Sequence, residues 1–288
     1  MTIAITDQEF AQFQRFIFER AGITIADSKR ALVTGRLSKR LVQRGLNSFG
    51  DYHRLLLSGH EAQEVQTAVD LLTTNETYFF REAKHFDLLR DVARDAARDG
   101  GAPLRVWSAA SSSGEEAYSA AMVLAEVLGE APWEVVGTDI SSRIVARARQ
   151  GHYPMERARH IPPHLLRRYC LRGLGEQDGT LLVERNLRQR VRFVHANLIA
   201  PLPALGQFDV VFLRNVLIYF NRDTKREVVR RVIGLLKPGG LFFIGHSESL
   251  NDISAPLDAV CPSVYRRRDE RAARLGRRQS DELLQELP

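Results

Sequence analysis

Residues 105–124 read RVWSAASSSGEEAYSAAMVL and hold the clearest structural pattern in the chain. Residues 105–109 predict a buried β-strand, and residues 114–128 predict a helix. The small residues between them would let a ligand approach the backbone beside the free N–H groups of the helix N-terminus. The segment lacks both the G-x-G-x-x-G pattern and the Gly-Lys-Ser/Thr of a Walker loop. It therefore favours a ligand without a pyrophosphate.

Strands and helices continue to alternate after this segment. Further strands are predicted at 134–138, 191–195, 208–213 and 241–244, and further helices at 141–150 and 222–236. This alternation predicts a mostly parallel, doubly wound α/β sheet, in which ligands bind beyond the carboxyl ends of the strands. Residues 155–190 interrupt the alternation with Pro162-Pro163 and several glycines, and they predict a small inserted β-subdomain.

The first part of the chain has a helical pattern instead. Phe10, Phe13 and Ile17 recur at helical spacing, and the next apolar residues repeat every four positions. We predict a helical domain at 1–72, a linking segment that covers the cofactor at 73–100, an α/β domain with the insert at 101–267, and a charged mobile tail at 268–288.

Composition limits the class of protein. The chain has 288 residues, of which 44% are hydrophobic, as is typical of a globular protein. No apolar run reaches the roughly 18 residues of a membrane span, and the N-terminal sequence lacks the pattern of a secretory signal. Cys170 and Cys261 are expected to be free thiols in a reducing cytoplasm, and no His, Cys or Asp residues have metal-ligand spacing. The sequence thus predicts a cytoplasmic protein without a bound metal.

Polar residues follow the ends of several predicted strands. Asp139 follows the second strand, Asn197 follows the third, and Arg214 and Asn215 follow the fourth. Each alone is as easily a helix cap, but together at one edge of a sheet they favour a ligand site. A carboxylate after the second strand suits the two hydroxyls of a ribose. S-adenosylmethionine fits such an edge, because it combines a ribose, an amino acid and a cation without a phosphate; Glu115 would supply a second carboxylate.

The sequence resembles the CheR-type chemotaxis receptor methyltransferases over residues 8–267. The matching segments are LTTNETYFFRE (72–82), RVWSAASSSGEEAYSAAMVL (105–124), GTDIS (137–141), FDVVFLRNVLIYF (208–220) and LKPGGLFFIGHSESL (236–250). The strand, loop and helix around Gly114 alone indicate only a class I methyltransferase. The Asn-x-Thr-x-Phe-Phe-Arg and Arg-Asn-x-x-Ile-Tyr-Phe elements are more specific. Ser113 replaces the usual threonine of the family and keeps its hydroxyl.

The resemblance implies a set of cofactor-contacting and catalytic residues. The residues implied to contact S-adenosylmethionine are Asn75, Thr77, Arg81, Glu115, Asp139, Asn197, Leu198, Arg214 and Asn215. Glu116 is adjacent to Glu115, so the choice between these two glutamates stays open. Tyr219 and Arg81 would lie near the transferred methyl group. The implied acceptor is a receptor glutamate, whose carboxylate is already ionised and needs no base; His246 and Glu248 are therefore expected to be structural.

The charge distribution suggests how a receptor would bind. Residues 1–50 carry a net charge of +4 and residues 155–195 carry +5, whereas the rest of the chain up to 265 carries −5. Arg36, Arg40 and Arg44 recur every four residues, so this helix face either docks on an acidic receptor helix bundle or is merely solvated. The insert resembles a β-subdomain that binds a receptor C-terminal peptide, and its loop contains Gly173 and Gly175. We expect a monomer that binds no nucleic acid and does not insert into a membrane.

Two other functions stay open at this point. The first is an RNA or small-molecule methyltransferase on the same fold, but the insert has few aromatic residues for base stacking and the α/β core is acidic. The second is a non-catalytic scaffold that binds S-adenosylmethionine or receptor tails. The presence of Asn75, Arg81, Asp139 and Tyr219 argues against a loss of activity.

Overall fold

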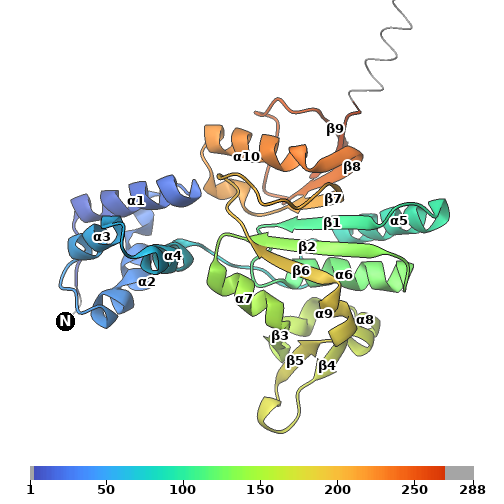
Figure 1. Ribbon diagram of the computed structural model, residues 1–288, viewed down its shortest axis with the longest axis horizontal. Coiled ribbons are helices and arrows are strands. Elements are labelled where there is room, and N and C mark those ends of the chain that lie inside the picture. Colours follow the sequence, from blue (N-terminus) through green and yellow to red (C-terminus); the bar gives the residue numbers. More distant parts are fainter. Residues whose placement is uncertain (1–2, 270–288) are drawn as a thin grey trace, which may run out of the picture.

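The computed structural model describes residues 3–269, which form a helical domain beside an α/β domain (Figure 1). The helical domain contains α1 (Asp7–Ala21), η1 (Asp27–Lys29), α2 (Arg30–Gln43), α3 (Phe49–Leu57) and α4 (Ala62–Leu72). Helix α1 begins at a capping box, in which the Thr6 hydroxyl accepts from the Glu9 N–H and the Glu9 carboxylate accepts from the Thr6 N–H. It ends at Gly22, whose φ of 71° is left-handed. Phe13 and Tyr52 stack in the core of this domain.

The α/β domain is built on a seven-stranded sheet with the order β6-β2-β1-β7-β8-β10-β9. Its strands are β1 (Leu104–Ala109), β2 (Trp133–Asp139), β6 (Val191–His195), β7 (Phe208–Leu213), β8 (Leu236–Ile244), β9 (Leu257–Cys261) and β10 (Val264–Arg267). The pairs among β6, β2, β1, β7 and β8 are parallel, and β10 and β9 are antiparallel additions at one edge. The strand order reverses between β1 and β7, which is where ligands bind in such sheets.

Helices cover both faces of the sheet. They are α5 (Lys84–Asp99), α6 (Glu115–Leu128), α7 (Ser142–Gln150) and α10 (Arg222–Gly234). On one face, Val106 packs with Leu89 of α5 and the apolar side of α6. On the other face, Trp107 packs with Val228 and Val232 of α10. Neighbouring residues of β1 thus point to opposite faces, as expected for a strand buried on both sides.

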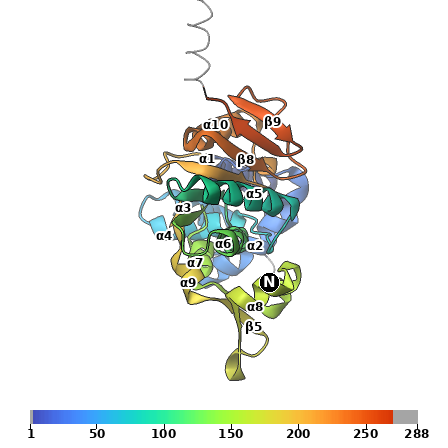
Figure 2. The ribbon, with the colours of Figure 1, turned by 90° about the vertical axis from the view of Figure 1, so that its right-hand side faces the viewer.

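The inserted segment forms a separate three-stranded antiparallel sheet with the order β3-β5-β4. Its elements are β3 (His152–Pro154), η2 (Met155–His160), α8 (Pro163–Tyr169), β4 (Cys170–Arg172), η3 (Gly175–Gln177), β5 (Thr180–Val183) and α9 (Arg185–Gln189). This β-subdomain and strand β9 lie at opposite ends of the molecule (Figure 2). The predicted tail at 268–288 falls almost wholly outside the described residues. None of the described helices is long and apolar enough to cross a membrane.

Candidate functional site

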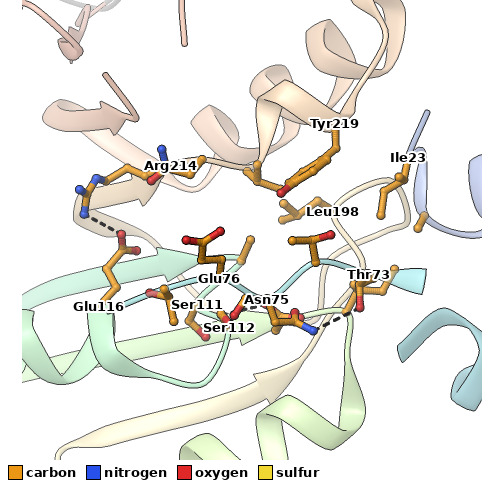
Figure 3. A pocket seen from close by; sticks show the side chains of 18 of the residues that line it. Ile23, Thr73, Asn75, Glu76, Ser111, Ser112, Glu116, Leu198, Arg214 and Tyr219 are labelled. Carbon is orange, nitrogen blue, oxygen red and sulfur yellow. Dashed lines mark hydrogen bonds and ion pairs between the residues drawn. The ribbon is translucent and has the colours of Figure 1, made fainter. Parts of the chain in front are cut away.

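A deep pocket lies at the carboxyl ends of β1, β2 and β7, where the strand order reverses (Figure 3). With its mouth and the adjoining open space included, the pocket has a volume of about 870 Å³. The helical domain contributes Ala21 and Ile23 to the wall, and the segment between the domains contributes residues 73–77 and Arg81. The pocket is therefore built by both domains.

The connecting segment, residues 73–83, is held against the sheet domain by hydrogen bonds. The Ser112 hydroxyl donates to the Asn75 carbonyl at 3.0 Å, and Arg157 of the β-subdomain donates to the Thr77 carbonyl at 2.6 Å. The Phe80 N–H donates to the Ser119 hydroxyl at 2.9 Å. Phe80 and Glu82 have positive φ angles, so the segment makes sharp turns that a helix would not allow. These contacts fix Asn75 and Thr77 at the pocket wall.

Asp139 ends β2 at the pocket wall and is only 6% exposed. Its two carboxylate oxygens accept from the N–H groups of Ser112 and Ser141, both at 2.9 Å. Burial raises the pKa of the Asp139 carboxyl, and the two backbone donors act in the opposite direction. Each oxygen keeps a lone pair for a further donor, so the carboxylate is oriented to accept ligand hydroxyls.

The two adjacent glutamates at the start of α6 have different environments. Glu116 lines the pocket, where its carboxylate accepts from the Ser108 hydroxyl at 2.7 Å and from Arg214 at 2.8 Å. Glu115 is buried outside the pocket wall and accepts from Ser113 and Arg157. Burial raises the pKa of both glutamates. Of the two glutamates between which the sequence left the choice open, Glu116 lines the pocket and Glu115 does not, because one residue along a helix turns the side chain by about 100°.

Arg214 follows β7 and joins three parts of the site. Its side chain is 1% exposed and forms ion pairs with Glu82 at 3.0 Å and with Glu116 at 2.8 Å. It also donates to the Arg81 carbonyl. Because a buried guanidinium needs such partners, Arg214 holds the connecting segment and the start of α6 in a fixed relation to the sheet.

The loop after Arg214 carries Tyr219 to the opposite wall. Glu248 accepts from the N–H groups of Asn215, Leu217 and Gly245 at 2.6 to 2.9 Å, which gives it the structural role predicted for it. Tyr219 lies in η4 (Leu217–Tyr219), and its side chain faces the pocket (Figure 3).

Backbone contacts tie the helical domain to the sheet domain beside Tyr219. The Thr24 N–H donates to the Tyr219 carbonyl at 2.9 Å, and the Asn197 amide donates to the Arg20 carbonyl at 2.7 Å. We call these two contacts the clasp. The clasp lies at the edge of the pocket, so it sets how closely the helical domain covers the site.

Two family models match the chain. The model described as "CheR methyltransferase, all-alpha domain" matches residues 8–73, and "CheR methyltransferase, SAM binding domain" matches residues 75–263. The chain belongs to the CheR methyltransferase family. The first match covers the helical domain, and the second covers the pocket-bearing domain with its mostly parallel sheet.

Curated relatives agree with this family over nearly the whole chain. The "Chemotaxis protein methyltransferase" of Escherichia coli is 44% identical over 91% of this chain and 92% of its own length. The "Chemotaxis protein methyltransferase 2" of Pseudomonas aeruginosa is 43% identical over 90% of this chain and 93% of its own length. The family, its class I methyltransferase fold and its cofactor, S-adenosylmethionine, are thus as predicted from the sequence.

The pocket of this CheR methyltransferase fits its cofactor. Asp139 would suit the ribose hydroxyls, and Ile140 and Leu198 are apolar parts of the lining against which an adenine would fit. Glu116 and Glu76 line the part of the wall that could receive the positively charged amino group. The ionisable groups of the lining are carboxylates, an arginine pair and a tyrosine, and the lining contains no His or Cys among the described residues.

The pocket brings together most of the residues predicted for the cofactor and the methyl group. These are Asn75, Thr77, Arg81, Asp139, Asn197, Leu198, Arg214, Asn215 and Tyr219. Ile23, Glu76 and Ser111 also line the pocket but were not predicted. Glu76 and Ser111 lie within motifs that were already singled out, whereas nothing in the local sequence around Ile23 indicates a contact with the other domain.

None of the residues predicted for receptor binding lines the pocket, although Arg36 contacts Thr73 and Thr74 of its wall. Arg36 donates to the Leu72 and Thr73 carbonyls at 2.9 and 3.1 Å, and so supports the connecting segment. Arg40 and Arg44 form ion pairs with acidic residues of the α3–α4 region. All three guanidinium groups therefore have partners within the helical domain, unlike those of a simple solvated face.

The two predicted glycines lie in the loop between β4 and β5. Gly173 is tightly packed, because a Cβ there would lie 1.9 Å from the Gln177 carbonyl oxygen. Gly175 has a φ of 59° and open space around it. The loop thus has one glycine that its packing requires and one that its backbone conformation favours.

Proposed function

We propose that this protein transfers the methyl group of S-adenosylmethionine to glutamate side chains of chemoreceptors and forms glutamyl methyl esters. The observation that carries the proposal is the pocket at the switch point of the sheet, whose lining includes Arg81 and Tyr219 from the two most specific family motifs. The relatives are named chemotaxis protein methyltransferases, and these names support chemoreceptors as the substrate class.

The chemistry needs positioning more than acid–base catalysis. A glutamate with a pKa near 4.3 is ionised at neutral pH, so its carboxylate oxygen can attack the methyl carbon directly. The new C–O bond forms as the C–S bond breaks, and the electron pair of that bond stays on sulfur. The enzyme's part is to hold the two reactants in line and to exclude water. Because the acceptor carboxylate is already ionised, the reaction needs no general base from the pocket.

Arg81 and Tyr219 are the groups proposed to orient the acceptor carboxylate. Arg81 lies over the ring of Tyr78 at 5.7 Å and donates to the Glu76 carbonyl at 3.3 Å. These contacts restrain the guanidinium without neutralising it, so its charge is available to a carboxylate. The Tyr219 hydroxyl would supply a second, weaker donor from the other wall.

The test is a methyl-transfer assay with purified protein, labelled S-adenosylmethionine and receptor-containing membranes. We expect base-labile label on receptor glutamates and little label with the Asp139→Asn variant, which loses the carboxylate at the ribose position. Total RNA serves as the alternative acceptor. Label in RNA, or cofactor binding without any transfer, would replace the proposal by one of the two other functions.

A receptor is proposed to reach the protein at two places. The first is the exposed surface around Arg44 at the end of α2, in the helical domain that contributes to the pocket wall. The second is strand β4, which pairs with β5 on one side only among the described strands. Leu171 of β4 is 54% exposed, and the groove beside it also contains Arg167 and Arg172. A peptide with an acidic group could add to this edge as a further strand.

A further inference from the structure

A second cluster of polar side chains lies beside Arg214, outside the pocket wall. It consists of Glu82 in the connecting segment, His85 in the first turn of α5, and His246 in the loop after β8. One carboxylate oxygen and one ring nitrogen from each histidine lie within 4.8 Å of one another. We propose that this triad is a binding site for a divalent first-row transition-metal ion, with Zn²⁺ as the best fit.

The distances suit a metal site with small adjustments. Oε2 of Glu82 lies 3.4 Å from Nδ1 of His85 and 3.8 Å from Nε2 of His246. Ligands that hold Zn²⁺ tetrahedrally at about 2.0–2.2 Å are about 3.3 Å apart. His246 is half-exposed, so a change of its side-chain rotamer would close the remaining gap. Its exposure also gives the ion a path from solvent and leaves a fourth position for water.

His85 is the strongest single indication. The side chain is 2% exposed, and neither ring nitrogen has a hydrogen-bond partner among the described residues. The ring is enclosed by Phe243 and His246, with centroid distances of 5.1 and 5.0 Å. Buried polar atoms without partners are rare and call for an explanation such as a bound ion. A metal ion bound to Nδ1 would satisfy this imidazole.

Glu82 supplies the negative charge that would attract a cation. Its carboxylate pairs with Arg214, which also pairs with Glu116. Arg214 also competes for Oε2 of Glu82, which limits the affinity to a moderate value. Imidazole and carboxylate ligands suit Zn²⁺, Cu²⁺ or Ni²⁺ better than Mg²⁺ or Ca²⁺.

The triad was not predicted from the sequence. His246 was expected to be structural, and the linear spacing of the acidic and histidine residues suggested no metal site. The ligands come from the segment before α5, from the first turn of α5 and from the loop after β8, and these parts meet where His85 packs against Phe243 of β8.

The experiment is a Zn²⁺ titration of the full chain after metal removal, followed by calorimetry. The Cys261→Ser variant is used as background, because Cys261 is an exposed thiol. We expect one saturable site with a dissociation constant in the micromolar range or below, weakened at least tenfold by His246→Ala. The matched control is His60→Ala, which removes an exposed histidine of the helical domain and should leave binding unchanged.

Two further measurements make the result decisive. His85→Phe keeps an aromatic ring against Phe243 and should also abolish binding, with thermal unfolding used to verify the fold. Bound Co²⁺ should give visible absorption that is absent in His246→Ala. The proposal is overturned if millimolar Zn²⁺ gives no saturable signal, or if His246→Ala and His60→Ala bind Zn²⁺ equally. Neither the calorimetry nor the Co²⁺ absorption measures methyl transfer, so a negative result here would leave the proposed function untouched.

Discussion

Tyr219 offers the sharpest test of the site at the level of a single residue. Its carbonyl belongs to the clasp, whereas its hydroxyl is the group proposed to orient the acceptor. Tyr219→Phe removes only the hydroxyl, so we expect the turnover number to fall by about tenfold or more, with cofactor affinity nearly intact. The measurement is steady-state methyl transfer together with calorimetric cofactor binding. Tyr265→Phe, on strand β10 between β8 and β9, is the control; equal turnover in both variants would remove Tyr219 from the proposed chemistry.

The site residues differ in how well the sequence could predict them. Asp139, Asn197 and Arg214 were predictable, because residues that follow parallel strands meet at one edge whatever the details of packing. The choice between Glu115 and Glu116 was not, because it depends on the rotation of α6 against β1. Ile23 could not be predicted either, because it reaches the pocket wall only through the contact between the two domains.

At the level of elements, the pairing of α2 with α4 has a consequence for acid stability. Glu64 of α4 is 3% exposed and accepts from Arg40 at 2.6 Å and from the Tyr52 hydroxyl at 2.8 Å. The hydrogen bond from Arg40 is the main reason that the pKa of Glu64 lies below its ordinary value. A lowered folded-state pKa stabilises the domain above the unfolded-state pKa, and this contribution is lost as the pH falls through the folded-state pKa.

We therefore expect Glu64→Gln to destabilise the protein by about 2 kcal/mol at neutral pH. The difference from wild type should shrink as the pH falls below about 4.5, the ordinary carboxyl value. Denaturant unfolding at a series of pH values measures it. Glu61→Gln, which removes a partner from a more exposed pair with Arg44, should cost about 0.5 kcal/mol or less. A difference that does not change with pH would show that the pair has no role in acid stability.

The exposed side of α2 can be tested without disturbing the core of the domain. Arg44→Ala removes a partly exposed cation near the proposed receptor surface, and Arg54→Ala on α3 removes a more exposed one that also has an acidic partner. We expect Arg44→Ala to raise the KM for receptor membranes, with a larger effect at low salt because screening is weaker there. Equal KM values for the two variants would exclude this surface from docking.

Strand β4 gives the fourth prediction. A receptor C-terminal pentapeptide should bind with heat detectable by calorimetry, and Leu171→Asp should weaken binding by placing a charge on the free edge of the sheet. Leu174→Asp is the control, because Leu174 is also exposed but lies beyond the strand. If millimolar peptide releases no heat with the wild-type protein, the edge does not serve as a tether.

Several elements were predicted within one or two residues, and others were missed for physical reasons. Strand β1, helix α6 and helix α7 follow strong local patterns, so their bounds agree closely with the prediction. Strand β8 begins at Leu236, before the predicted 241–244, because the Pro-Gly-Gly sequence resembles a turn but forms an irregularity within the strand, in which Gly239 has a φ of 77°. Helix α5 lay inside a segment interpreted as a linker, although Phe86, Leu89 and Ala93 have helical spacing.

At the scale of the whole molecule, the regular spacing of the arginines could not show which of them pair with acidic residues in the folded protein. Arg36, Arg40 and Arg44 repeat on one helix face, but their partners come from later in the chain, so part of the +4 of the first 50 residues is balanced inside the folded domain. The positive charge that the helical domain can offer to an acidic receptor is therefore smaller than the linear sequence suggests. A larger share of the positive charge of the β-subdomain stays available.

The clasp has a kinetic consequence. Ala21 and Ile23 form part of the pocket wall, so any movement of the helical domain changes the width of the exit for S-adenosylhomocysteine. We expect Thr24→Pro, which removes the donated N–H, to speed product dissociation in stopped-flow measurements; an unchanged rate would show that the exit lies elsewhere. A receptor bound to the helical domain would then change how long S-adenosylhomocysteine stays in the pocket. The rate of receptor methylation would depend on this residence time as well as on the rate of the methyl-transfer step.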